Sequence, residues 1–117
     1  MTQVITRYFD SLEQSLEARS ELVYRRRLSQ QIITVYETAD DLAIRLAGEG
    51  VDLKTAKAYE ARMAKGGAVL MVRAGYKPLG VAQTTRDVTA DMGAADLGDL
   101  VEEVSVPDAR KPTLSVL

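Results

Sequence analysis

The chain of 117 residues has no histidine, no cysteine and no tryptophan. Without histidine it lacks the side chain that most often serves enzymes as a general base and proteins as a transition-metal ligand. Without cysteine it has no disulfides, thiolate zinc sites or cysteine nucleophiles. We therefore expect no catalytic residue, no metal site and no cofactor, and we predict that the protein is not an enzyme.

Long apolar segments and an excess of basic residues are missing as well. No run approaches the roughly 18 apolar residues of a membrane helix, and the start MTQVITRYFD lacks the pattern of a signal peptide. We expect a cytoplasmic protein with no membrane span, able to dock peripherally on a larger complex. The net charge of -2 gives no overall attraction for phosphates, so we expect no nucleic-acid partner.

What is present is the pattern of one α+β domain over residues 1–106. Apolar and β-branched runs predict strands at 4–9, 30–37, 68–74 and 99–106, and apolar residues at helical spacing predict helices between them. The third run, AVLMVRA, is apolar on both faces, which is typical of an internal strand. Right-handed crossovers then predict a two-layer sandwich, with a ferredoxin-like four-stranded sheet whose first and third strands are central. Helices cover one face, and a helical insertion joins strands two and three.

Acidic residues begin the predicted helices. Asp10 and Glu13 have the spacing of a capping box, and Thr38 is placed to cap a helix whose first turn holds Asp40 and Asp41. A pair of carboxylates at a helix N-terminus already has a structural reason to be there. We therefore assign Asp40 and Asp41 no catalytic role.

The first helix ends in the arginines of RRRLS. Arg25, Arg26 and Arg27 are predicted to lie in its last turn, where cations complement the negative end of the helix dipole. The alternative is a contact patch for an acidic partner. The apolar residues predicted near one face of this helix are Leu12, Leu16, Leu22 and Val23.

The loop GYKPLG follows the third strand, and Gly75 and Gly80 have the spacing of the glycines in a phosphate-binding P-loop. A P-loop continues with lysine and a hydroxyl residue, whereas this chain continues with Val81 and Ala82. The nucleotide-hydrolysis interpretation therefore fails.

Three interpretations of the loop remain. The glycines and proline can simply turn the chain from strand into helix. Tyr76 and Lys77 can form a partner-binding loop, because an exposed aromatic beside a lysine is a suitable anchor. Arg73 and Lys77, with the amides at the start of the next helix, can bind a small anion.

Residues 107–117 are predicted to be an extended C-terminal tail. Pro107 and Pro112 discourage regular structure, yet the tail ends in TLSVL. Leu114, Val116 and Leu117 suit docking in a groove or on a sheet edge, on this domain, on a second copy or on another protein.

Two segments, FDSLEQSLEARSELV and TAKAYEARMAKGGAVLMVRA, resemble the small bacterial domain of the heat-induced general stress proteins. The resemblance implies a noncatalytic accessory or stress role and supplies no catalytic residues. Together with the composition it favours a noncatalytic interaction protein, either stress-associated or a small accessory subunit of a larger assembly. Such a protein acts by oligomerisation or by docking on a protein partner. The alternative hypothesis is a regulatory module that binds a small anionic metabolite.

Overall fold

The computed structural model describes residues 2–75, 80–95, 98 and 100–107. Its four strands are β1 (Thr2–Phe9), β2 (Ile33–Tyr36), β3 (Ala68–Ala74) and β4 (Glu103–Val106). Its four α-helices are α1 (Leu12–Ser20), α2 (Leu42–Gly48), α3 (Leu53–Met63) and α4 (Val81–Asp91). A π-helical turn, Glu21–Arg25, extends α1, and a short 3₁₀ turn, Gln30–Ile32, leads into β2.

The strands form one open sheet in the order β2-β3-β1-β4, and every neighbouring pair is antiparallel. The α+β class and the ferredoxin-like order with β1 and β3 in the centre are therefore confirmed. The central pair is in register from Gln3 opposite Ala74 to Phe9 opposite Ala68. All residues of β3 except Arg73 are buried, as expected for an internal strand apolar on both faces.

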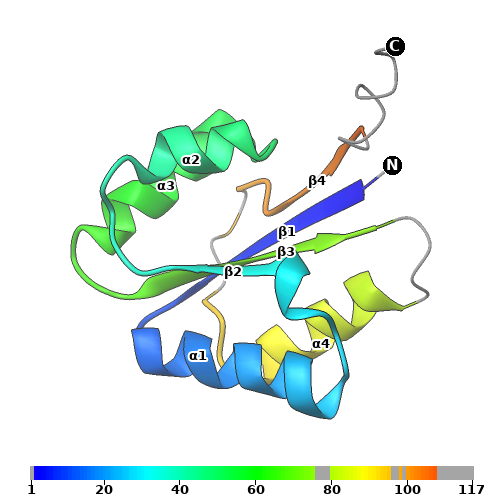
Figure 1. Cartoon of the computed structure of the whole chain (residues 1–117). Coiled ribbons are helices and arrows are strands. Elements are labelled where there is room, and N and C mark those ends of the chain that lie inside the picture. The colour runs from blue at the N-terminus through cyan, green and yellow to red at the C-terminus, as the bar shows by residue number, and fades with distance from the viewer. Residues whose placement is uncertain (1, 76–79, 96–97, 99, 108–117) are drawn as a thin grey trace.

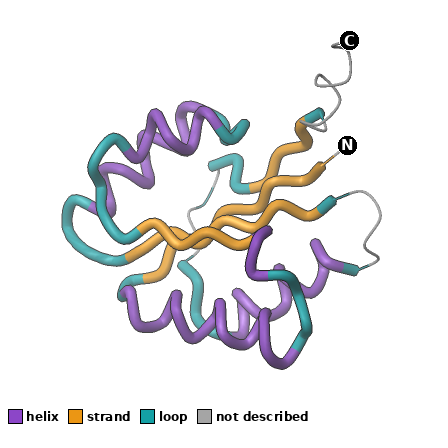
Figure 2. The backbone as a smooth tube through the Cα atoms, viewed as in Figure 1, coloured by secondary structure: helices purple, strands orange, loops and turns teal. Residues whose placement is uncertain are grey.

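Helices cover both faces of this sheet. The crossover helices α1 and α4 lie together on one face, whereas the inserted pair α2 and α3 lies on the other (Figures 1 and 2). The insertion therefore adds a third layer to the predicted two. The physical reason is the two-sided apolar character of the central strands, which needs cover on each side.

Successive side chains of each central strand enter opposite layers. On β3, Val69 and Met71 belong to the core beneath α2 and α3, while Leu70 and Val72 belong to the core with α1 and α4. The largest fully buried side chain is Tyr59 of α3, whose hydroxyl donates to the backbone oxygen of Thr6 at 3.1 Å. Each layer is thus a separate apolar cluster on a shared sheet.

Two helix starts differ from their predictions. Ser11, not Asp10, caps α1, because its hydroxyl accepts the amide of Gln14 at 3.1 Å. The prediction that Thr38 caps the next helix is also wrong, because α2 begins only after Asp41. Asp41 has a left-handed backbone (φ 54°), and its side chain makes no capping hydrogen bond. A turn in which the amide of Leu42 donates to the oxygen of Ala39 at 3.1 Å takes the place of the expected first helical turn.

The turn from α3 into β3 depends on glycine. Gly67 has a φ of 94°, and a Cβ there would lie 2.5 Å from the backbone oxygen of Phe9. Next to it, the Tyr8 hydroxyl donates to the oxygen of Gly66 at 2.7 Å. The backbone of this turn therefore lies directly against the end of β1, and only glycine fits there.

Candidate functional site

The three arginines are placed differently from one another. Arg25 ends the π-helical turn, whereas the amide of Arg26 caps that turn by donating to the oxygen of Glu21 at 3.1 Å. Arg27 follows in a left-handed conformation, with φ of 61°. The prediction of one last helical turn containing all three is therefore wrong, because the chain leaves the helix at Arg26. All three side chains are exposed.

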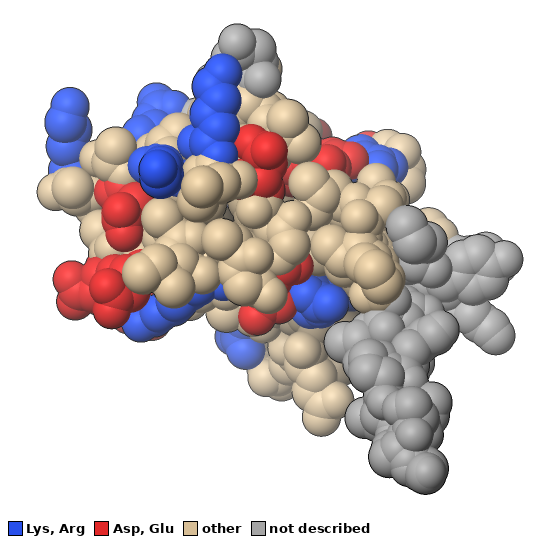
Figure 3. Space-filling view, turned by 90° about the horizontal axis from the view of Figure 1, so that it is seen from above, with Lys and Arg blue, Asp and Glu red and all other residues tan. Residues whose placement is uncertain are grey.

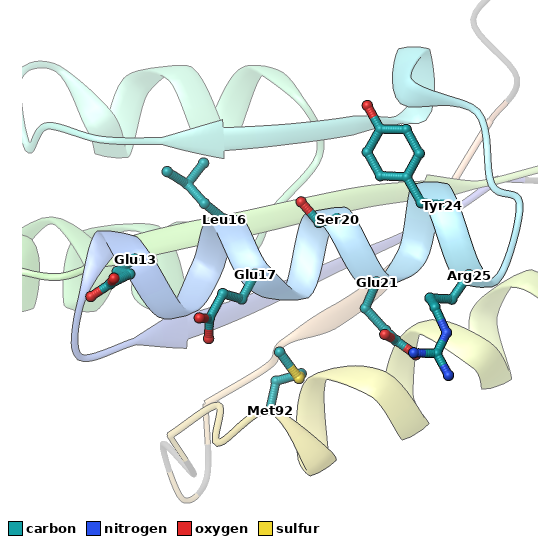
Figure 4. Close-up of a pocket in the computed structure, with 8 residues that line it drawn as sticks. All are labelled: Glu13, Leu16, Glu17, Ser20, Glu21, Tyr24, Arg25 and Met92. Carbon is teal, nitrogen blue, oxygen red and sulfur yellow. The ribbon is translucent and has the colours of Figure 1, made fainter.

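Arg25 lies at one end of a shallow groove along the outer side of α1, with a volume of about 600 Å³. We call it the α1 groove. It is lined by Glu13, Leu16, Glu17, Ser20, Glu21, Tyr24, Arg25 and Met92. Figure 4 shows Leu16, Ser20 and Tyr24 along one side of the helix and Glu17 and Glu21 along the other, nearer to Met92.

The α1 groove lies on the solvent-facing side of the helix, whereas the opposite side packs on the sheet. Ala18 and Leu22 are fully buried, while Leu16 is 41% exposed and Tyr24 is 74% exposed. Leu16, Ser20 and Tyr24 follow each other at a spacing of four, so they form one row on the helix surface. The expectation that Leu16 shares a face with Leu22 is wrong, and the exposed apolar row was missed.

Arg26 and Arg27 line a different hollow, of about 330 Å³, at the start of α4. Gly80, with φ of 79°, precedes α4 and leaves its first turn without a side-chain cap. The remaining lining residues are Leu28, Ser29, Ile32, Val81 and Thr84. The arginine cluster therefore contributes to two surfaces, and it is not a single patch.

The remaining predicted site residues are separated from these surfaces or fall outside the description. Arg73 binds Glu49 through an ion pair of 2.7 Å, so its guanidinium already has a carboxylate partner. Tyr76, Lys77, Leu114, Val116 and Leu117 lie outside the described residues. The residues 108–117 of the predicted tail are outside them too.

A charged contact between three elements was not predicted. Arg7 of β1 and Arg86 of α4 bind the two carboxylate oxygens of Glu103 on β4, at 2.6 and 2.9 Å. Burial by itself would raise the pKa of Glu103, but the hydrogen bonds from Arg86 and Arg7 outweigh it and hold that pKa below its ordinary value. Arg7 and Glu103 are 96 positions apart, so no local pattern could have indicated the pair.

Other features of the described residues are structural. Burial raises the pKa of Tyr59 well above its ordinary value, which keeps its hydroxyl protonated as a donor to Thr6. Among residues 2–75, 80–95, 98 and 100–107, no cluster of acidic side chains has the arrangement of a metal site. Within the same residues, no helix is long and apolar enough to cross a membrane.

The charges on the α2 and α3 side are mixed. Seen from above, basic and acidic side chains are both present around a largely uncharged surface, and neither sign forms a continuous field (Figure 3). Such a surface does not create the potential that concentrates polyanions. The α1 groove differs from this face in its exposed Leu16 and Tyr24.

Comparison with known proteins corrects the resemblance inferred from the sequence. The model of the PucE light-harvesting protein-like family matches residues 23–117. No curated protein and no solved structure matches the chain. The resemblance to the heat-induced general stress domain is wrong, because it rested on short segments with common strand and helix patterns. The stress-associated role and the metabolite-binding alternative are corrected with it. The chain belongs to the PucE light-harvesting protein-like family.

Proposed function

We propose that the protein has a non-enzymatic role in light harvesting, exercised through contacts with other protein chains. The observation that carries the proposal is the family match, which spans residues 23–117 and so includes β2, β3, β4, α2, α3 and α4. Light harvesting is carried out by assemblies in which proteins hold one another in position. This chain contacts other proteins in such an assembly. The cytoplasmic location predicted from the sequence remains part of the proposal.

The composition supports a role for protein contacts over one in pigment attachment. Histidine and cysteine are the side chains that most often bind the metal of a porphyrin-type group or form a covalent bond to a cofactor, and the chain has neither. Apolar side chains such as Tyr24 and Leu16 are exposed on its helices instead. An exposed tyrosine is a common anchor of protein interfaces.

A deletion and a copurification test the proposal together. Cells lacking the protein should show an altered absorption spectrum of their light-harvesting complexes, and reintroducing the full chain should restore it. An affinity-tagged chain should copurify with pigment-bearing complexes after fractionation into cytoplasm and membranes. An unchanged spectrum together with a tagged chain that separates from every pigmented fraction would refute the light-harvesting role.

A further inference from the structure

The α1 groove combines an apolar row with an acidic row. Leu16 and Tyr24 are large, exposed side chains on one side, and Met92, the residue that follows α4, lines the groove on the other. Glu13 and Glu17, both exposed, are acidic residues of the same lining (Figure 4). An occupant that fits must therefore carry apolar side chains next to positive charges.

The end of this chain has that chemistry. In RKPTLSVL, residues 110–117, two basic residues precede apolar residues at alternating positions. Leu114 and Val116 would point to the same side of an extended segment. Arg110 and Lys111 complement the acidic residues of the α1 groove, so the charges of the two surfaces are opposite.

The lengths of the two surfaces also agree. From Lys111 to Val116 an extended chain spans about 17 Å, taking about 3.3 Å for each residue. From Glu13 to Tyr24 the helix spans about 16 Å, at about 1.5 Å for each residue. A segment with Lys111 at Glu13 therefore brings Val116 to Tyr24 and places Leu114 between Leu16 and Tyr24.

The position of β4 indicates that the tail binds the α1 groove of another molecule and not that of its own chain. The tail follows β4, whose Val106 pairs with Thr2 at the sheet edge. On the face that carries α1, the helix beside β4 is α4, because Arg86 of α4 binds Glu103 of β4. The helix α1 contacts β1, β2 and β3 instead. To reach the α1 groove of its own chain, the tail would have to pass around α4.

We propose that the α1 groove binds residues 108–117 of a second copy of this chain. Val116 packs on Tyr24, Leu114 packs between Leu16 and Tyr24, and Arg110 and Lys111 lie against the acidic residues Glu13 and Glu17. Each copy presents one groove and one tail, so reciprocal exchange closes a dimer and one-way exchange extends a chain of copies. The proposal concerns self-association and does not depend on the light-harvesting role.

The test uses a labelled peptide of residues 107–117 and two forms of the protein, the full chain and a chain ending at Pro107. The peptide should bind the shortened chain saturably in fluorescence anisotropy. The full chain should gain mass with concentration in analytical ultracentrifugation, and the shortened chain should stay monomeric. A shortened chain that associates like the full chain, or that does not bind the peptide, would overturn the proposal.

Two matched variants of the shortened chain locate the binding surface. Tyr24→Ser should weaken peptide binding at least tenfold, whereas Ile44→Ser should leave it unchanged. Ile44 is 73% exposed on α2, on the other face of the sheet, and is thus matched to Tyr24 in exposure. The double variant Glu13→Gln, Glu17→Gln should weaken binding several-fold and reduce its salt dependence. Thermal melting confirms that each variant is folded.

The remaining outcomes contradict the proposal. Equal losses in Tyr24→Ser and Ile44→Ser would show that the α1 groove is not the binding surface. A full chain that remains monomeric at every concentration and does not bind the peptide, while the shortened chain does, would place the tail in the groove of its own molecule.

Discussion

At the scale of single residues, Glu103 links parts of the chain that are 96 positions apart. Its carboxylate accepts hydrogen bonds from Arg7 on β1 and Arg86 on α4, and its side chain is one quarter exposed. Two guanidinium groups on one carboxylate provide more than a typical surface ion pair, because each also fixes the geometry of its neighbour. This contact connects the edge strand β4 to both the central strand and a helix.

The pKa of Glu103 makes this contribution dependent on pH. Because its pKa is lower in the folded protein than in the unfolded chain, the contribution is complete above the unfolded value and disappears as the pH falls through the folded value. We expect Glu103→Gln to lower the free energy of unfolding at pH 7 by about 1 to 3 kcal/mol. The difference from the unsubstituted protein should shrink below about pH 4.

Urea unfolding at a series of pH values measures this effect. The matched control is Glu37→Gln, at an exposed position after β2, which should change the stability little at any pH. A constant difference between Glu103→Gln and the unsubstituted protein from pH 7 to pH 3 would contradict the proposed ionic origin.

At the scale of elements, the turn between α3 and β3 determines how the insertion meets the sheet. Gly67 places its backbone against Phe9, at the end of β1. The Tyr8 hydroxyl binds the neighbouring Gly66, and the guanidinium of Arg62 lies 5.0 Å from the centre of the Tyr8 ring. One short turn thus connects the α2 and α3 layer to a central strand.

We therefore expect Gly67→Ala to be one of the most destabilising small changes in the chain. Its Cβ meets a backbone oxygen that cannot rotate away, and the positive φ adds strain, so the loss should exceed about 2 kcal/mol. The matched control is Gly48→Ala at the end of α2, where a Cβ has no neighbour within 4 Å. It should be neutral or stabilising by up to about 1 kcal/mol, because alanine is the better helix former.

Thermal melting of the two alanine variants decides the point. Similar melting temperatures for Gly67→Ala and Gly48→Ala would show that the turn adapts to a side chain and would contradict the close approach to Phe9.

At the scale of the whole molecule, the net charge is small and the three consecutive arginines do not form one surface. The net charge is -2, and Arg25 lies in a different hollow from Arg26 and Arg27. Neither surface has the run of basic side chains with which proteins follow a phosphate backbone.

We accordingly predict no submicromolar binding to duplex DNA at physiological salt. Fluorescence anisotropy with labelled duplexes of unrelated sequence is the measurement, and the triple variant Arg25→Ser, Arg26→Ser, Arg27→Ser is the comparison. Tight binding that the triple variant abolishes would make the arginines a nucleic-acid surface and contradict this prediction.

Much of the fold followed from patterns within short windows. The two-sided apolar run of β3 was predicted, and all of its residues except Arg73 are buried. The order of elements and the handedness of crossovers then restricted the sheet to the observed strand order. These features are local, or depend on chain connectivity, so one sequence is enough to determine them.

Other features depended on which surfaces meet in space. A helical period does not say which side of a sheet an inserted pair covers, so the third layer had to come from the packing of Leu42 and Leu46 against β1 and β3. Which residues of the helical segment face the solvent also depended on packing: Tyr24, in the π-helical turn that extends α1, is 74% exposed. The α1 groove and the contact of Arg7 with Glu103 join residues from separate elements. Only the tertiary structure decided them, because the free energy of such contacts depends on distances that the order of residues does not contain.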